Sequence, residues 1–138
     1  MRRRTQAREF ALQILYQIDI THDACDVALG NFWQGYSKDD IAADVKEFAD
    51  GLVRGVTSNL EAIDGKITQY ATNWQLKRMP VVDRNILRMS CFELIFCDDI
   101  PPKVVINEGV ELAKKYSEID AGKFVNAILD KVKQELKK

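Results

Sequence analysis

The stretch IAADVKEFADGLVRGVTSNLEAIDGKI, residues 41–67, sets the class of fold. Its apolar residues recur at three- and four-residue intervals: Val45, Phe48, Leu52, Val56, Leu60, Ile63 and Ile67. This spacing places them on one face of an α-helix. The run predicts either one long bent helix or two helices with a break near residues 57–59. Gly51 and Gly55 lie one turn apart, and we expect another backbone to approach closely there, because glycine weakens a helix.

The same helical spacing continues toward the N-terminus. In residues 7–18 the apolar side chains form one stripe, made of Ala7, Ala11, Ile14, Leu15 and Ile18. This helix is expected to end near residues 20–23. A short second helix is predicted over about 23–32, followed by a break at residues 35–37. Ser37 is expected to cap the next helix, with Asp39 and Asp40 in its first turn.

Three further helices are predicted toward the C-terminus. Pro80 suits the first position of a helix that ends before residues 98–102, because its missing N–H would be unpaired there. Two more helices are expected over about 103–116 and 122–136. No stretch alternates apolar and polar residues as a strand does. The sequence therefore predicts one all-α domain, residues 1–138, with about seven helices.

Composition and charge narrow the class of protein. With 46% hydrophobic and 30% charged residues, the chain has the composition of a globular protein. No apolar run reaches the roughly 20 residues that span a membrane, and no signal peptide is recognisable, so a cytoplasmic protein is expected. The net charge of −1 hides a basic start, an acidic middle and a basic end. This asymmetry indicates a polyanionic partner, although solvated helices can show it by chance.

The residues needed for the common catalytic and metal sites are missing. The three cysteines, Cys25, Cys91 and Cys97, have no zinc-ligand spacing and are expected to be reduced core thiols. His22 is the only histidine and lies at a predicted helix end. No glycine-rich phosphate-binding motif is present. We therefore expect no catalytic residue, no metal, no cofactor and no enzymatic activity.

The N-terminal segment carries the strongest candidate for a binding site. Its residues at four-residue spacing are expected to form a line that turns away from the core stripe: Arg4, Arg8, Leu12 and Tyr16. Arginines bind phosphates through bidentate hydrogen bonds, and an exposed tyrosine stacks on an unpaired base. From these residues alone, a solvated terminus with Tyr16 at the rim of the core remains an alternative.

Two other segments are weaker candidates. Phe124 follows Lys123 at the start of the last helix, where it is either a core residue or a second stacking surface. Asp83, Arg84 and Arg88 are expected on the polar side of a strongly apolar helix. That polar side is either a solvated face or a surface for a partner.

Four segments together carry a resemblance to a known family: AREFALQILYQID, NWQLKRMPVVDRNILRMSCFEL, IPPKVVINEGVELAKKYS and GKFVNAILDKV. In this order and spacing they resemble the NusB family of bacterial transcription antitermination factors. The resemblance covers nearly the whole chain and is poorest over about 21–48. Gly109 stands where the family usually has alanine, which is expected to weaken that helix by about 1 kcal/mol.

The resemblance implies a fold of two packed three-helix sub-bundles and a non-enzymatic role. Members of the family bind the single-stranded boxA element of nascent RNA together with a small-subunit ribosomal protein that serves as NusE. They act in the RNA polymerase antitermination complex and promote read-through, notably of ribosomal RNA operons.

The resemblance also assigns residues to two surfaces. It implies an RNA-facing set made of Arg2, Arg3, Arg4, Arg8, Tyr16, Asp120, Lys123 and Phe124. It favours stacking over a core position for both rings. It implies a protein-partner surface made of Asp83, Arg84 and Arg88.

Two other functions compete with this one. The chain could be a helical protein-interaction module that never contacts RNA, its arginines serving only solubility. It could also be an accessory domain of an RNA methyltransferase; with no Rossmann-like segment, it would then be a fragment. The sequence leaves open whether the protein is a monomer or a homodimer that covers its RNA face.

Overall fold

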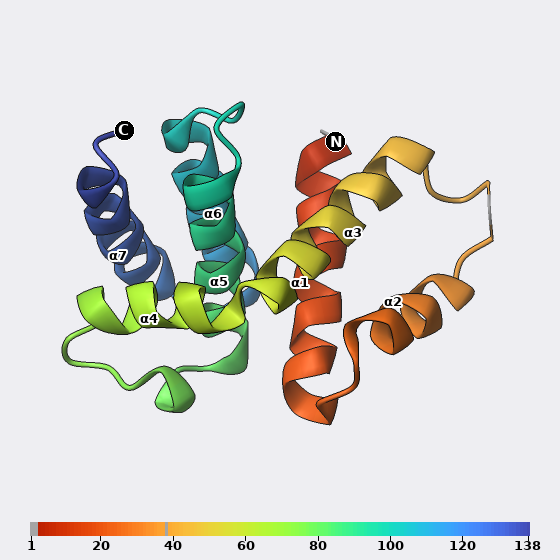
Figure 1. The fold of residues 1–138 in the computed structure, drawn as a ribbon, viewed down its shortest axis with the longest axis horizontal. Coiled ribbons are helices and arrows are strands. Elements are labelled where there is room, and N and C mark those ends of the chain that lie inside the picture. Colours follow the sequence, from red (N-terminus) through yellow and green to blue (C-terminus); the bar gives the residue numbers. More distant parts are fainter. Residues whose placement is uncertain (1–2, 38) are drawn as a thin grey trace. The chain divides into compact units, whose positions relative to one another are not determined.

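The computed structural model describes residues 3–37 and 39–138, and their regular secondary structure is entirely helical (Figure 1). The described elements, in chain order, are α1 (Arg3–Thr21), α2 (Cys25–Gln34), α3 (Ala43–Ser58), α4 (Leu60–Tyr70), the 3₁₀ turn η1 (Leu76–Arg78), α5 (Val81–Phe96), α6 (Pro102–Tyr116) and α7 (Ala121–Glu135). The predicted all-α class with about seven helices is confirmed.

The chain forms two compact units, Met1–Ser58 and Asn59–Lys138. The boundary falls at Asn59, whose φ of −121° and ψ of 22° are not helical. This residue separates α3 from α4. The amphipathic run 41–67 is therefore two helices, and the break lies where the sequence predicts it.

In the first unit, α1 packs against α3 and α2, and α2 also contacts α3. The core comes from apolar residues at helical spacing, including Ala7, Ala11, Ile14, Leu15, Val45, Ala49, Leu52 and Val56. Beside it, Phe10 of α1 makes edge contacts with Phe32 and Trp33 of α2. The Trp33 indole N–H donates to Asp50 Oδ1 at 2.7 Å, which ties α2 to α3.

In the second unit, α5 packs against α4, α6 and α7, and α6 lies along α7. The buried side chains include Ile63, Ile67, Ile86, Leu87, Met89, Leu94, Leu112, Val125, Leu129 and Val132. This unit contains four α-helices, one more than a three-helix sub-bundle, because α4 belongs to it.

Three local expectations are wrong. The helix after Ser37 begins only at Ala43, and the Ser37 backbone N–H instead donates to the Asp40 carboxylate at 3.1 Å in a preceding turn. Pro80 lies one residue before α5. Outside the backbone of its own helix, no atom of the described residues lies within 4 Å of the position where a Gly51 Cβ would stand, so the expected close approach is not found there.

The described residues contain neither a membrane-spanning helix nor a metal-binding cluster. No helix among them is long and apolar enough to cross a membrane. They contain no group of three or more His, Cys, Asp or Glu side chains arranged to hold a metal ion.

Candidate nucleic-acid interface

Two exposed arginines stand at the start of α1, Arg3 and Arg4; Arg2 lies outside the described residues. Arg3 Nε is 3.4 Å from the Asp44 carboxylate, and the two side chains are 63% and 61% exposed. Such a solvated ion pair contributes little and exchanges readily for a phosphate. The Arg4 guanidinium lies 4.7 Å from the centre of the Phe48 ring, which orients it without neutralising its charge.

Arg8 is buried, with only 2% of its surface exposed, so the expectation that it offers its guanidinium to solvent is wrong. The guanidinium lies 5.4 Å from the centre of the Phe48 ring. A four-residue step turns about 40° around a helix. The line from Arg4 through Arg8 and Leu12 therefore crosses the buried face, where Leu12 is 5% exposed.

Tyr16 emerges from the other edge of that buried face and is 42% exposed. Twelve residues separate it from Arg4, which corresponds to about 18 Å along the helix and about 120° around it. The two side chains are therefore suited to contact different nucleotides. Stacking of Tyr16 on a base stays a prediction.

In the second unit, Asp120, Lys123 and Phe124 lie at the start of α7. Asp120 occupies the N-cap position but makes no capping hydrogen bond, and Lys123 is exposed. Phe124 is half-buried and meets Trp74 edge-on, with the ring centres 5.5 Å apart and the planes at 64°. Phe124 is thus neither a core residue nor an isolated surface ring.

A cavity of about 200 Å³ opens beside this aromatic pair. It is lined by Trp74, Met79, Pro80, Asp83, Glu118, Asp120, Ala121 and Phe124. Sequence reasoning missed Trp74, which is 57% exposed. A tryptophan within an otherwise polar loop, ahead of a proline, was the available signal.

The polar residues of α5 are committed to contacts within the second unit. Asp83 is 6% exposed and accepts a hydrogen bond from the Ser117 hydroxyl at the end of α6. The Arg88 side chain is 12% exposed and binds both oxygens of Asp64 on α4, at 2.8 and 3.0 Å. Asp83 and Arg88 therefore do not lie on a solvated face, which was one of the two alternatives from the sequence, because α5 packs against α4, α6 and α7.

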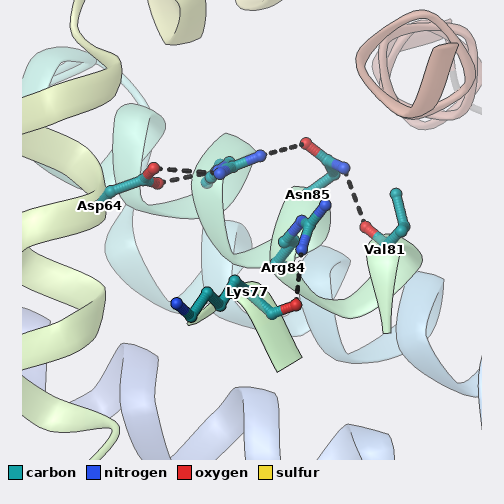
Figure 2. A network of polar contacts seen from close by, with 6 residues as sticks. Asp64, Lys77, Val81, Arg84 and Asn85 are labelled. Atoms are coloured by element: carbon teal, nitrogen blue, oxygen red, sulfur yellow. Dashed lines mark hydrogen bonds and ion pairs between the residues drawn. The ribbon is translucent and has the colours of Figure 1, made fainter. Parts of the chain in front are cut away.

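Arg84, like Arg88, is half-buried. Its Nη1 donates to the Lys77 carbonyl oxygen at 3.3 Å, which ties α5 to η1 (Figure 2). In the same view Asn85 donates to the Val81 carbonyl oxygen, and Asp64 accepts from the neighbouring arginine. These contacts position the face of α5 that was assigned to a partner.

Comparison with known proteins identifies the family. The model of the NusB family matches residues 5–134. The chain belongs to the NusB family. A transcription antitermination protein NusB from Anaeromyxobacter dehalogenans is 51% identical over 94% of this chain and 89% of its own length. Another NusB, from Trichlorobacter lovleyi, is 46% identical over 94% of this chain and 89% of its own length.

Solved NusB structures share the fold. NusB from T. maritima is 36% identical, with a TM-score of 0.86, over 96% of this chain and 91% of that one. A structure of the antitermination factors NusB and NusE in complex with double-stranded RNA is 32% identical, with a TM-score of 0.86, over 98% of both chains.

Proposed function

We propose that this protein is a transcription antitermination factor that binds a boxA-type single-stranded RNA together with the ribosomal protein NusE. The observation that carries the proposal is membership of the NusB family over residues 5–134. The 32% identical NusB that was solved with NusE and RNA supports the choice of partners. The role is one of binding, within the RNA polymerase antitermination complex, and not of catalysis. A protein acting on nascent RNA, notably of ribosomal RNA operons, works in the cytoplasm.

The accessible cations and the aromatic rings would contribute to RNA binding in different ways. Arg3, Arg4 and Lys123 are exposed and would hold phosphates, which position the strand without reading its sequence. Tyr16 and Phe124 would stack on unpaired bases, from which sequence selectivity arises. We take the two units to act as one RNA-binding domain, residues 1–138.

Arg8, Asp83 and Arg88 take supporting roles in this proposal. Arg8 packs against the Phe48 ring on which Arg4 also lies, so it fixes the base of the arginine cluster. Asp83 and Arg88 hold α5 in place, and Arg84 lies on the helix that would meet NusE. The partner contributes affinity, since a few contacts rarely give tight binding once ordering costs are subtracted.

The test is fluorescence anisotropy with a labelled boxA-type strand and a scrambled strand of equal composition, with and without NusE. We expect the boxA-type strand to bind more tightly, and NusE to increase the preference. Tyr16→Ala and Phe124→Ala should each weaken binding about 5- to 150-fold, the range for loss of one stacked base. Lys131→Glu, an exposed change elsewhere on α7, serves as the control.

Equal and weak binding to both strands in every condition would contradict the proposal. That result would show only a non-specific attraction of RNA to the arginine side chains. It would favour the alternative function of a protein-interaction module. An unchanged affinity in both ring variants, with boxA preference intact, would reject the two stacking assignments alone.

A further inference from the structure

One side of α3 contacts the three arginines of α1. Asp44 and Phe48 are four residues apart on α3, so their side chains are neighbours on one side of that helix. The Asp44 carboxylate lies 3.4 Å from Arg3 Nε. The guanidinium groups of Arg4 and Arg8 both lie over the Phe48 ring. Two residues of α3 thus determine the surroundings of all three arginines.

The Phe48 ring holds the Arg4 guanidinium without using its hydrogen-bond donors. The guanidinium carbon lies 4.7 Å from the ring centre, within the roughly 6 Å of a cation–π contact. The face of a ring attracts the cation, whereas a carboxylate would occupy its N–H groups and cancel its charge. The contact with Phe48 therefore leaves the N–H groups of Arg4 available for the oxygens of a phosphate.

Phe48 is itself held in place. It is half-buried within α3, next to the buried residue Ala49, and the guanidinium of Arg8, which is 2% exposed, lies 5.4 Å from its ring centre. Arg4, in contrast, is exposed in the first turn of α1. Ordering an exposed arginine when a ligand binds costs side-chain entropy. Contact with a fixed ring removes part of that cost before the RNA arrives.

Asp44 acts on Arg3 in the opposite direction. Its carboxylate stands beside Arg3 Nε, where a phosphate oxygen would otherwise bind. Both side chains are more than 60% exposed, so the ion pair orders neither of them strongly. A phosphate that binds Arg3 must displace this carboxylate or lie close to a like charge, which is unfavourable. The ion pair thus lowers the affinity of Arg3 for phosphate more than it prepares Arg3 to bind.

We propose that Phe48 is a positioning residue for RNA binding and that Asp44 is a built-in competitor of the RNA phosphate. Phe48 acts through Arg4, and Asp44 acts through Arg3. The inference rests on the RNA-binding function proposed above. It adds two residues of α3 that change the affinity for RNA in opposite directions.

Variants of the full chain test the role of Phe48 in the anisotropy assay with the labelled boxA-type strand. Phe48→Leu keeps an apolar side chain but removes the ring, and should weaken binding about two- to fivefold. Phe48→Tyr keeps the face of the ring and should rescue most of this loss. In the Arg4→Gln background, Phe48→Leu should have no further effect. Phe32→Leu is the matched control, because it makes the same change in a ring that packs on Phe10 and Trp33.

A second measurement of the Phe48 contact does not depend on RNA. The ring current of Phe48 should shift the side-chain protons of Arg4 upfield in the NMR spectrum of the free protein. The shift should persist in Phe48→Tyr and disappear in Phe48→Leu. Circular dichroism of each variant confirms that the helices are intact.

Asp44→Asn tests the competitor role, because it removes the charge and nearly keeps the shape. Binding of the boxA-type strand should strengthen about two- to fivefold, the effect of one exposed ion pair. The gain should fade at high salt and should be absent in the Arg3→Gln background. Glu47→Gln is the matched control: it removes an equal charge from an exposed side chain of α3 that contacts no arginine within the described part of the chain. It should change the affinity less than twofold.

The outcomes separate this inference from the proposed function. An unchanged affinity in Phe48→Leu, or a loss that persists in full in the Arg4→Gln background, would overturn the positioning role while boxA preference remained. Equal or weaker binding by Asp44→Asn would overturn the competitor role. Absence of any RNA binding by the wild type would overturn the proposed function and this inference with it.

Discussion

Arg8 illustrates how a charged residue can belong to the core of its unit. It stands in a cluster of arginines in the sequence, yet its guanidinium lies against the Phe48 ring and 2% of its surface is exposed. Arg4 contacts the same ring from an exposed position. The four-residue spacing predicts one accessible line, but its drift of about 40° per step places the Arg8 side chain on the buried face.

Cys91 should be chemically inert in the folded protein. Burial raises the pKa of its thiol from 9.0 to about 12. At pH 8 this lowers the thiolate fraction by about a thousandfold, and only the thiolate reacts. We expect iodoacetamide to modify Cys25 and Cys97, which are partly exposed, and to reach Cys91 only in denaturant. Mass spectrometry counts the labels, and a third label under native conditions would refute the prediction.

Position 109 requires glycine because Ser90 of α5 lies close to it. A Cβ at this position would lie 2.7 Å from Ser90 Oγ and 3.3 Å from a Leu129 methyl carbon. Gly109→Ala should therefore lower the free energy of unfolding by about 1 kcal/mol, because overpacking outweighs the gain in helix propensity. Ser90→Ala removes the nearer atom, so the loss should disappear in the double variant. Urea unfolding of the four proteins measures this coupling.

Gly51 provides the matched control for that experiment. It lies on α3, and apart from that helix's own backbone the described part of the chain places no atom within 4 Å of its Cβ position. Gly51→Ala should raise the free energy of unfolding by up to about 1 kcal/mol through helix propensity alone. A gain at both glycines would show that the contact with Ser90 is unimportant.

Among the helices, α4 and α7 are joined by a polar cluster centred on Glu135. Its carboxylate accepts from Lys66 Nζ at 2.5 Å, from the Tyr70 hydroxyl at 2.7 Å and from Gln69 Nε2 at 3.3 Å. Hydrogen bonding to Lys66, more than to Tyr70, lowers the pKa of Glu135 below 4.5. The hydrogen bond to Glu135 raises the pKa of Tyr70 above 10.0.

Glu135→Gln should therefore destabilise the protein in a defined pH window. The lowered pKa of the carboxylate gives stability that is present above pH 4.5 and lost as the pH falls through the folded-state value. The raised pKa of Tyr70 gives stability that is present below pH 10.0 and lost above it. The difference in unfolding free energy between wild type and variant should be largest between these limits, as urea unfolding at several pH values can measure.

A control variant separates the effect of disrupting the Glu135 cluster from the effect of losing one negative charge. Glu111→Gln removes an equal charge from an ion pair whose side chains are 61% and 69% exposed. Its effect on stability should be small across the same range. If the difference in unfolding free energy between wild type and Glu135→Gln did not vary with pH, the negative charge of the Glu135 carboxylate would not be the source of its stabilising effect.

The helices could be predicted from the sequence because each buries apolar side chains that recur at helical spacing. The break before Leu60 and the start of α6 near Pro102 follow from local residues. The start of α3 at Ala43 does not, because Asp40 closes a turn with Ser37 that competes with a helix cap. The partners of Arg88 and Asp83 were also out of reach, since Asp64 and Ser117 lie on other helices.

For the whole molecule, a net charge of −1 predicts little long-range attraction for RNA. Binding then depends on local contacts, and each phosphate neutralised on a single strand contributes about −0.7 to the log–log salt slope. With Arg3, Arg4 and Lys123 as the exposed candidates, we expect a slope of about −2. Arg4→Glu should make it shallower by about 0.7, and Lys131→Glu should not. An unchanged slope in Arg4→Glu would remove Arg4 from the interface.

At this scale the sequence indicated the family, the charge asymmetry and the candidate residue types for an RNA contact. It could not indicate the cavity, because Trp74, Asp83 and Phe124 come from a loop and two helices that meet only in the folded second unit. Residue spacing describes one helix at a time, whereas a cavity depends on how several pack. The same reason explains why α4 was not assigned in advance to the second unit.

The burial of Arg8 has a consequence for proteolysis. Trypsin cuts after arginine only where the chain can open into its active site, and exposed termini open most easily. Brief digestion of the native protein should cut after Arg3 or Arg4 and leave the bond between Arg8 and Glu9 intact. A cut after Arg4 would leave the core intact and remove the arginines that face solvent, so an RNA-binding assay on the trimmed protein would test their proposed role separately from the folding role of Arg8.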